Sequence, residues 1–285
     1  MAFWFLIASV VIALAAAAAV WFGQKRETAR VEGLRLALGQ SAAPTACTTV
    51  DFATLAALPP PVLRYFRRVL NDGQKVIQAA YFSQTGALRT SLQTAHWSAF
   101  TARQWVVPAA PGFVWSARVA MPLATHVGVQ DSYVAGAGSG RVSLLSALAV
   151  AAESGQPELN AGALHRYLAE AVWYPTALLP QFGVVWTPIN DHAALATLSD
   201  HGITVTLEFR FKPTGEVSGI YSPGRYGRFA GQYRQVPWEG HFADDFEQAG
   251  LRVPRRGEVG WYDEQGALQL VWKGELRDAR YEFVS

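Results

Sequence analysis

The chain has 285 residues, of which 51% are hydrophobic, 12% aromatic and only 16% charged, with a formal net charge of +2. So small a positive charge argues against electrostatic binding of nucleic acid, because such proteins carry basic patches or stripes. A single cysteine excludes an intramolecular disulfide framework. The length leaves room for one large domain or two small ones with a sizeable core.

The N-terminus is a continuous apolar run from Ala2 to Phe22, in which Ser9 is the only polar side chain. A helix over these residues would be roughly 30 Å long, which matches the hydrocarbon core of a bilayer. Trp4 and Trp21 lie near its two ends, where interfacial aromatic residues belong. We therefore expect residues 1–24 to be a single transmembrane anchor that contacts the membrane lipid bilayer through residues 2–22.

A cleaved signal peptide is the alternative interpretation of this run. Signal peptides begin with basic residues and have a shorter apolar stretch, whereas no Lys or Arg precedes Lys25 here. Cys47 lies too far beyond the run to be a lipoprotein cysteine. Positive charge follows the run at Lys25, Arg26 and Arg30, which favours a cytoplasmic domain. A lone N-terminal anchor before a β-rich domain also suits export, so the opposite side stays open.

Residues 25–50 are expected to connect the anchor to the domain. Val31, Leu34 and Leu38 have helical spacing, and residues 39–49 are typical of a flexible linker. A β-rich globular domain over 51–285 should then open with a short helix at 51–58. A second helix follows Pro59, with one apolar face. That face comprises Val62, Tyr65, Phe66 and Val69.

From Val76 onward the apolar residues alternate, which indicates strands separated by turn residues. The expected strands are 76–84, 87–94, 97–106, 112–121, 125–134, 140–149, 183–187, 192–199, 202–211, 215–221, 225–236, 240–247, 257–263 and 267–283. One strong helix interrupts them, with Asn160 as its expected N-cap and Pro175 ending it. Its apolar stripe comprises Leu164, Tyr167, Leu168, Ala171 and Val172.

Many short strands joined by tight turns predict an α+β fold that is mostly antiparallel β. A sheet of this size curls instead of staying flat. We expect a transmembrane helix followed by a large curved antiparallel sheet, a half-barrel, with one or two helices covering its concave face.

Motifs for metal, phosphate or nucleophile chemistry are not present in the sequence. The six histidines never have metal-ligand spacing, and no zinc, P-loop or serine-hydrolase motif occurs. The glycine-rich segment 136–140 lies between two predicted strands, which favours a hairpin turn. We therefore predict neither a cofactor nor a metal, and we assign no catalytic residue.

Two pairs of charged residues are the candidate polar sites. Arg166 and Glu170 are spaced i, i+4 on the helix, where a solvated surface ion pair is the ordinary interpretation. The apolar neighbours of this pair instead favour a cavity or a clamp to the sheet. Arg118 and Asp131 lie on adjacent predicted strands and could pair across a hairpin, again as a structural clamp or as part of a site.

Tryptophans are frequent, and most lie in or beside predicted strands or the helix. They are Trp97, Trp105, Trp115, Trp173, Trp186, Trp238, Trp261 and Trp272. Aromatic side chains of this size belong mostly to the core. Their number also fits an apolar ligand cavity inside the curved sheet, for which we select Trp115 and Trp173.

Several segments resemble an uncharacterised bacterial family, in which a hydrophobic N-terminal segment precedes a β-rich domain. The resemblance rests on GFVWSAR at 112–118, DSYVAGAG at 131–138 and RYLAEAVWYPTALLP at 166–180, and extends over residues 55–283. It implies no activity. The expected architecture is also loosely similar to the half-barrel of outer-membrane lipoprotein carriers and related lipid-binding lipoproteins.

The leading hypothesis is a membrane-anchored protein that binds an apolar or lipid-like ligand in the cavity of the curved sheet. Its candidate ligand-binding residues are Arg118, Asp131, Arg166, Glu170, Trp115 and Trp173. Arg118 or Arg166 would meet an acidic head group. A structural domain that binds a membrane-protein partner is one alternative. A carboxylate-dependent enzyme with Glu170 or Asp131 as general base is the other.

Overall fold

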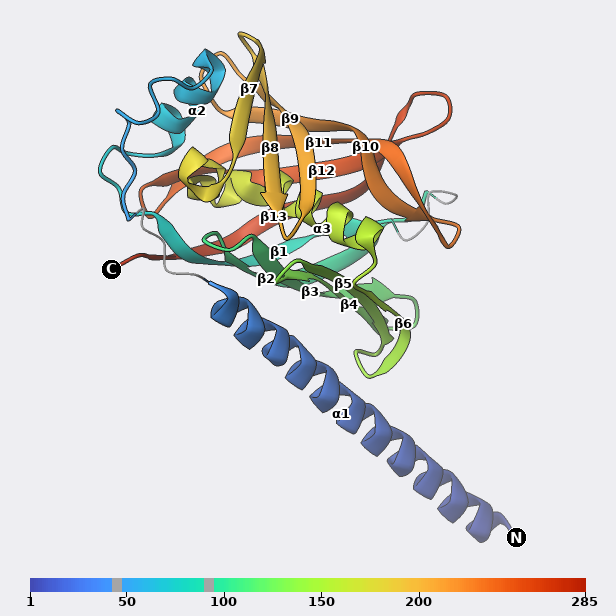
Figure 1. The fold of residues 1–285 in the computed structure, drawn as a ribbon. Coiled ribbons are helices and arrows are strands. Elements are labelled where there is room, and N and C mark those ends of the chain that lie inside the picture. Colours follow the sequence, from blue (N-terminus) through green and yellow to red (C-terminus); the bar gives the residue numbers. More distant parts are fainter. Residues whose placement is uncertain (43–47, 90–94) are drawn as a thin grey trace.

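The computed structural model describes residues 1–42, 48–89 and 95–285. It confirms the predicted α+β class: a long N-terminal helix projects from a domain built on one 13-stranded antiparallel sheet (Figure 1). The helices are α1 (Ala2–Ser41), α2 (Pro60–Val69) and α3 (Pro157–Glu170). Three short 3₁₀ helices follow α3, at Ala171–Trp173, Pro175–Leu178 and Pro180–Phe182.

The strands follow each other closely along the chain. They are β1 (Ile77–Leu88), β2 (Ser98–Val107), β3 (Gly112–Met121), β4 (Thr125–Val134), β5 (Ala137–Leu144), β6 (Leu148–Ser154), β7 (Val185–Asn190), β8 (Ala193–Asp200), β9 (Ile203–Phe211), β10 (Val217–Phe229), β11 (Gln232–Gln248), β12 (Leu251–Tyr262) and β13 (Leu268–Phe283). Their order in the sheet is β6-β5-β4-β3-β2-β1-β13-β12-β11-β10-β9-β8-β7.

The sheet is an open half-barrel made of two meanders that meet at β1 and β13. Strand β6 is one edge and β7 is the other. The segment between them, containing α3 and the 3₁₀ turns, crosses the concave side and connects the two edges (Figure 1). Helix α3 is therefore enclosed by strands of both meanders, as the prediction of a helix on the concave face requires.

Helix α2 begins where the sequence predicted, whereas α3 begins earlier than predicted. Helix α2 buries Val62, Tyr65, Phe66 and Val69 as predicted. The prediction that Asn160 caps α3 is wrong, since the helix begins at Pro157 after Gln156. The Oδ1 atom of Asn160 instead accepts a hydrogen bond of 2.8 Å from the backbone N–H of Gly138. Residues 51–58 form turns, not the predicted helix.

Three strands continue through residues that were predicted to end them. Strand β1 passes Gly86, where a Cβ atom would clash with the Lys273 carbonyl oxygen. Glycine is therefore present because neighbouring backbone is close, not because the chain turns. Strand β10 absorbs Pro223 as a register shift between Ser222 and Arg225, and β11 continues past Pro237. Part of the predicted strand 87–94 lies outside the described residues.

Aromatic side chains fill the middle of the concave face. Gly86, Gly274 and Gly257 are direct cross-strand neighbours, which leaves a row without side chains. Trp272 and Trp173 lie over this row, close to Gly274 and Gly257 respectively. Phe82, Phe100 and Phe242 complete the aromatic cluster. The deepest part of the half-barrel is thus core, and a ligand must bind elsewhere on this face.

Helix α1 runs unbroken from the apolar run into the segment that was expected to be a separate connector. Gly39 to Ser41, predicted as linker, are helical, whereas residues 43–47 lie outside the described residues. The most apolar 18-residue window of α1 has a mean hydropathy of 2.5, and none of it is buried against the domain. The helix is long and apolar enough to cross a membrane. By length and composition, α1 can serve as a membrane anchor or as a signal sequence.

Candidate functional site

The candidate site lies on the concave face where α3 passes over β2, β3 and β4. Asp131, Trp115 and Gln104 are direct cross-strand neighbours, so their side chains share one face of the sheet. Helix α3 places Arg166 above this row. The structure thus brings together four predicted residues, namely Asp131, Trp115, Arg166 and Glu170.

Arg166 bridges the two carboxylates. Its Nε atom lies 2.8 Å from Glu170 Oε1, and its Nη1 atom lies 2.9 Å from Asp131 Oδ2. The guanidinium also lies 4.9 Å from the ring centres of both Phe113 and Trp115. Only 18% of the Arg166 side chain is exposed. The pair is therefore a clamp between α3 and the sheet, not a solvated surface pair.

A chain of buried hydrogen bonds extends from this clamp into the sheet. The Glu170 Oε2 atom accepts 2.6 Å from Gln104 Nε2, and Gln104 Oε1 accepts 2.8 Å from Gln84 Nε2. The Oε1 atom of Gln84 accepts 2.8 Å from the Trp115 indole N–H. These linked amides fix the Glu170 carboxylate, because each lost bond would leave a buried polar atom unpaired.

A second arginine, Arg225 on β10, approaches α3 from the other meander. Its Nη2 atom donates 2.9 Å to the Gly162 carbonyl oxygen, and its guanidinium stacks on Trp238 at 4.6 Å and Trp261 at 5.1 Å. Burial, together with the Arg166 charge, lowers the pKa of Arg225 to about 10. Within the described residues, no carboxylate lies within ion-pair distance of it. Arg225 is therefore a cation without a direct ion-pair partner, with Glu170 and Asp131 acting on it only at longer range.

A cavity of about 360 Å³ lies beside α3 and is lined by residues of α3, of the β10–β11 hairpin and of β3–β5. Arg166, Arg225 and Asp131 line it, with Phe113, Leu159, Tyr226 and Trp261 as apolar and aromatic surface. Arg228 and Glu153 also line it and pair with each other. The result is a cleft with aromatic walls, in which Arg225 and Glu158 are the lining charges without an ion-pair partner among the described residues.

Two predicted residues lie elsewhere. Trp173 belongs to the aromatic core, where its indole N–H donates 3.0 Å to the Pro254 carbonyl oxygen. Arg118 lies on the outer face, next to His126 at 3.2 Å. The predicted Arg118–Asp131 pair is wrong, since the register places Asp131 opposite Trp115 and Arg118 opposite Gly128. Trp115 and Arg118 are three positions apart on one strand, an odd number, so their side chains point to opposite faces.

Sequence reasoning missed Arg225, Gln84 and Gln104. The two glutamines occur at inward positions of strands that otherwise alternate cleanly, and a polar residue at an apolar position was a usable signal. Arg225 gave no such signal. It follows Pro223-Gly224, which marked a strand end in the sequence, and its neighbours Gly162 and Trp261 are distant in sequence.

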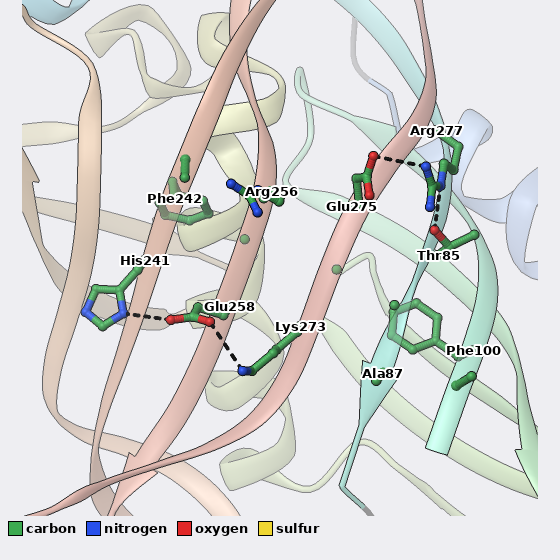
Figure 2. Close-up of a pocket in the computed structure, with 15 residues that line it drawn as sticks. Thr85, Ala87, Phe100, His241, Phe242, Arg256, Glu258, Lys273, Glu275 and Arg277 are labelled. Atoms are coloured by element: carbon green, nitrogen blue, oxygen red, sulfur yellow. Dashed lines mark hydrogen bonds and ion pairs between the residues drawn. The ribbon is translucent and has the colours of Figure 1, made fainter. Parts of the chain in front are cut away.

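A larger hollow of about 760 Å³ lies over the middle strands (Figure 2). Its polar groups neutralise each other: Glu258 lies between His241 at 3.5 Å and Lys273 at 3.9 Å, and Glu275 pairs with Arg277 at 3.0 Å. No group of three or more His, Cys, Asp or Glu suited to a metal occurs among residues 1–42, 48–89 and 95–285. This hollow offers no free charge, so we do not select it.

The fold is an open antiparallel half-barrel with an internal helix, preceded by a long apolar N-terminal helix. The chain belongs to a family of unknown function, DUF6544, whose model matches residues 48–273. This membership confirms the resemblance to an uncharacterised family. No curated protein matches the chain.

The solved structures that are similar to it include the following two. A LolA superfamily protein from Nitrosomonas europaea is 8% identical with a TM-score of 0.40, covering 81% of this chain and 96% of that one. A beta-barrel-like protein of a domain of unknown function, DUF1849, from Brucella abortus is 11% identical with a TM-score of 0.23, covering 73% and 98%.

Proposed function

We propose that the protein is a membrane-tethered binding protein for an apolar or lipid-like ligand with an acidic head group. The ligand occupies the cleft beside α3, and α1 keeps this cleft close to the bilayer. The observation that carries the proposal is Arg225, a cation that lines the cleft against the adjacent rings of Trp238 and Trp261 and has no carboxylate partner within ion-pair distance among the described residues.

The cleft suits such a ligand in size and chemistry. Its volume of about 360 Å³ falls within the roughly 300–1,000 Å³ that small-molecule sites occupy. A carboxylate or phosphate can accept two parallel hydrogen bonds from a guanidinium, which makes arginine suited to such head groups. Phe113, Leu159 and Trp261 then offer apolar contact for the attached chain.

The enzyme alternative has less support from this geometry. Asp131 and Glu170 both bind Arg166, and Glu170 also accepts from Gln104, so each carboxylate already has a structural role. The partner-domain alternative predicts that a second protein co-purifies with the full-length chain.

Binding of a fluorescent fatty acid to the full-length protein in nanodiscs tests the proposal. Replacing Arg225 with Gln (Arg225→Gln) should weaken binding of the acid at least about tenfold, the effect of losing one charged hydrogen-bonding partner. The same variant should bind the corresponding fatty alcohol as the unmodified protein does. Arg234→Gln removes an equal charge from the exposed face of neighbouring β11 and should leave both affinities unchanged.

Equal affinity of the acid for the unmodified protein and the Arg225→Gln variant would remove the head-group site. If neither compound binds, and a second protein instead co-purifies with the full-length chain, the partner-domain function replaces the ligand-binding one.

A further inference from the structure

The C-terminal half of α1 is docked on the outer face of the sheet. Leu38 packs against Val107 of β2 and Val114 of β3, with Val31 and Leu34 beside them. Gly112 lies so close to α1 that a Cβ atom there would be 2.6 Å from Leu38 Cδ1. This apolar contact fixes one end of the docked segment.

A buried ion pair fixes the other end. Glu27, 4% exposed, accepts three hydrogen bonds from Arg141 of β5: one of 2.7 Å from Nη2 to Oε1, and two from Nε, of 3.1 Å to Oε1 and 2.9 Å to Oε2. Gln24 Nε2 donates 2.9 Å to the Leu145 carbonyl oxygen. Since α1 continues without a break from this docked part into the apolar run (Figure 1), the domain and the apolar segment are rigidly joined.

Two hairpin tips lie where the apolar run of α1 ends. Gly23, the residue after Phe22, touches Ala147 in the β5–β6 tip, where a Cβ atom on Gly23 would lie 2.7 Å from the Ala147 oxygen. The β3–β4 tip is adjacent, since His126 Nε2 lies 3.0 Å from Ser146 Oγ. Any bilayer that surrounds residues 2–22 therefore reaches both tips.

These tips expose apolar side chains. After Phe22, the large apolar side chains that are exposed within the described residues are Leu36, Met121, Leu123, Leu144, Leu148, Val150, Val185 and Ile189. Five of these eight lie on the two hairpins, and we call Met121, Leu123, Leu144, Leu148 and Val150 the tip surface. Leu123 is 96% exposed and Leu148 is 65% exposed. A cluster of exposed apolar residues marks an interaction site.

Turn chemistry does not account for the leucine at position 123. Its φ is +60°, and Ala124 follows at +54°. Tight hairpin turns with positive φ favour Asn, Asp or Gly, and Leu there is unfavourable. The side chain also contributes nothing to the core, because it is almost fully exposed. Its apolar character thus serves a contact outside the domain.

Basic side chains lie beside the tip surface. Lys25, Arg26 and Arg30 are exposed on α1 just beyond the apolar run, and Arg118 is exposed near the β3–β4 tip. Apolar tips with adjacent cations match the boundary of a bilayer, where acyl chains meet phosphate groups.

We propose that the tip surface inserts into the same membrane leaflet from which α1 emerges. Three points of contact, α1 and the two tips, then hold the domain against the bilayer in one orientation. The inference rests on the membrane tether of the proposed function and adds the surface that faces the lipid.

This seating places an apolar path at the membrane. Leu148, Leu144, Val127, Val119 and Phe100 are successive cross-strand neighbours on the concave face. The row begins at the tip surface and leads toward the interior on which α3 packs. A lipid leaving the bilayer at the tips would meet apolar surface and no charged side chain along this row.

Depth-dependent fluorescence quenching of the full-length chain in nanodiscs tests whether the tip surface inserts into the bilayer. The nanodiscs contain phosphatidylcholine and phosphatidylglycerol. With Cys47→Ser as background, single cysteines replace Leu123 or Leu148 and carry a polarity-sensitive fluorophore. Lipids with a spin label near the head group should quench both at least twofold. Val185→Cys, which is 62% exposed on the opposite edge of the sheet, is the matched control and should not be quenched.

A fourth labelled position, residue 12, tests membrane insertion of α1 independently of insertion of the tips. Ile12→Cys reports the apolar run itself and should be quenched by lipids labelled deep in the acyl chain. Quenching at residue 12 without quenching at 123 and 148 would refute the seating while the tether stands. No quenching at any position would refute the tether and the seating together. If lipid does not quench the fluorophore at position 148, and the unlabelled Leu148→Cys variant forms a disulfide with another copy of the chain, the tip surface is a self-association site and the proposed insertion is refuted.

Discussion

The burial of single residues decides the properties of the site. Arg166 lies on α3 and Arg225 lies beside it on β10, and only Arg166 has carboxylate partners within ion-pair distance among the described residues. His165, which precedes Arg166 in α3, is 7% exposed, and its Nδ1 atom lies 3.2 Å from the Ala161 carbonyl oxygen. Burial, and then the charge of Arg225, lower the pKa of His165 to about 4 from 6.5. The residue is therefore neutral in the folded protein at ordinary pH.

Acidification should destabilise the fold through His165. The unfolded chain takes up this proton below pH 6.5 and the folded chain only near pH 4, so stability falls as pH falls through this range. Between pH 7.5 and pH 5 the loss attributable to this residue should be about 2 kcal/mol. Urea midpoints of the full-length protein in detergent measure it. His165→Gln should reduce the pH dependence, whereas His192→Gln at an exposed turn should retain it.

A pH dependence that is the same in His165→Gln and in the unmodified protein would contradict this assignment.

At the scale of elements, α3 shows how a periodic sequence pattern is completed by long-range contacts. The i, i+4 spacing correctly placed Arg166 and Glu170 on one face, and their apolar neighbours correctly indicated limited exposure. The third partner, Asp131, comes from β4 and could not be paired correctly from strand alternation alone. In α1, the half that packs on the sheet buries Glu27. The apolar pattern of the sequence could not predict this burial, because Glu27 is a charged residue.

Glu170→Ala should destabilise the clamp on α3. The variant removes one of two carboxylates from Arg166 and leaves Gln104 without its acceptor, while Asp131 still compensates the guanidinium. We expect a loss of about 2–3 kcal/mol in the free energy of unfolding, since one partner of a buried charged network is gone. Denaturant titration of the full-length protein measures it.

Glu158→Ala is the matched control, because Glu158 lies on the same helix, in its first turn. Only a helix-dipole contribution below about 1 kcal/mol should be lost there. Equal, small effects of both variants would show that the pair behaves as an ordinary solvated ion pair.

The whole molecule is two meanders joined at β1 and β13, with α3 connecting their free edges. This closure makes the first and last strands of the domain neighbours in the middle of the sheet. Helix α1 leaves the outer face near the β5–β6 tip, on the side away from α3 (Figure 1).

We predict that the domain faces the cytoplasm. Lys25, Arg26 and Arg30 follow the apolar run and no basic residue precedes it, and basic flanks are retained on the cytoplasmic side. A cytoplasm-dependent reporter fused after Ser285 should be active, and protease added to spheroplasts should leave the domain intact. Digestion of the domain in intact spheroplasts would place it on the other side.

The sequence by itself determined the class of fold, because two periodicities are local properties. Alternation predicted most strands, and the 3.6-residue period predicted α2 and α3, since each depends only on which face of an element is buried. Where glycine or proline interrupts the pattern, at Gly86 and Pro223, the prediction ended strands that the structure continues. Local signals cannot distinguish a turn from a bulge or from close-packed backbone.

Only the tertiary structure decided which residues meet. Glu27 and Arg141 are 114 positions apart, and Arg225 and Gly162 are 63 apart. The pairing of β1 with β13, the docking of α1 and the cleft beside α3 all depend on such contacts. The cleft forms because the sheet is curved and encloses α3 between the two meanders. This curvature brings charged residues that are distant in sequence into one partly buried space, where they must be paired or be available to a ligand.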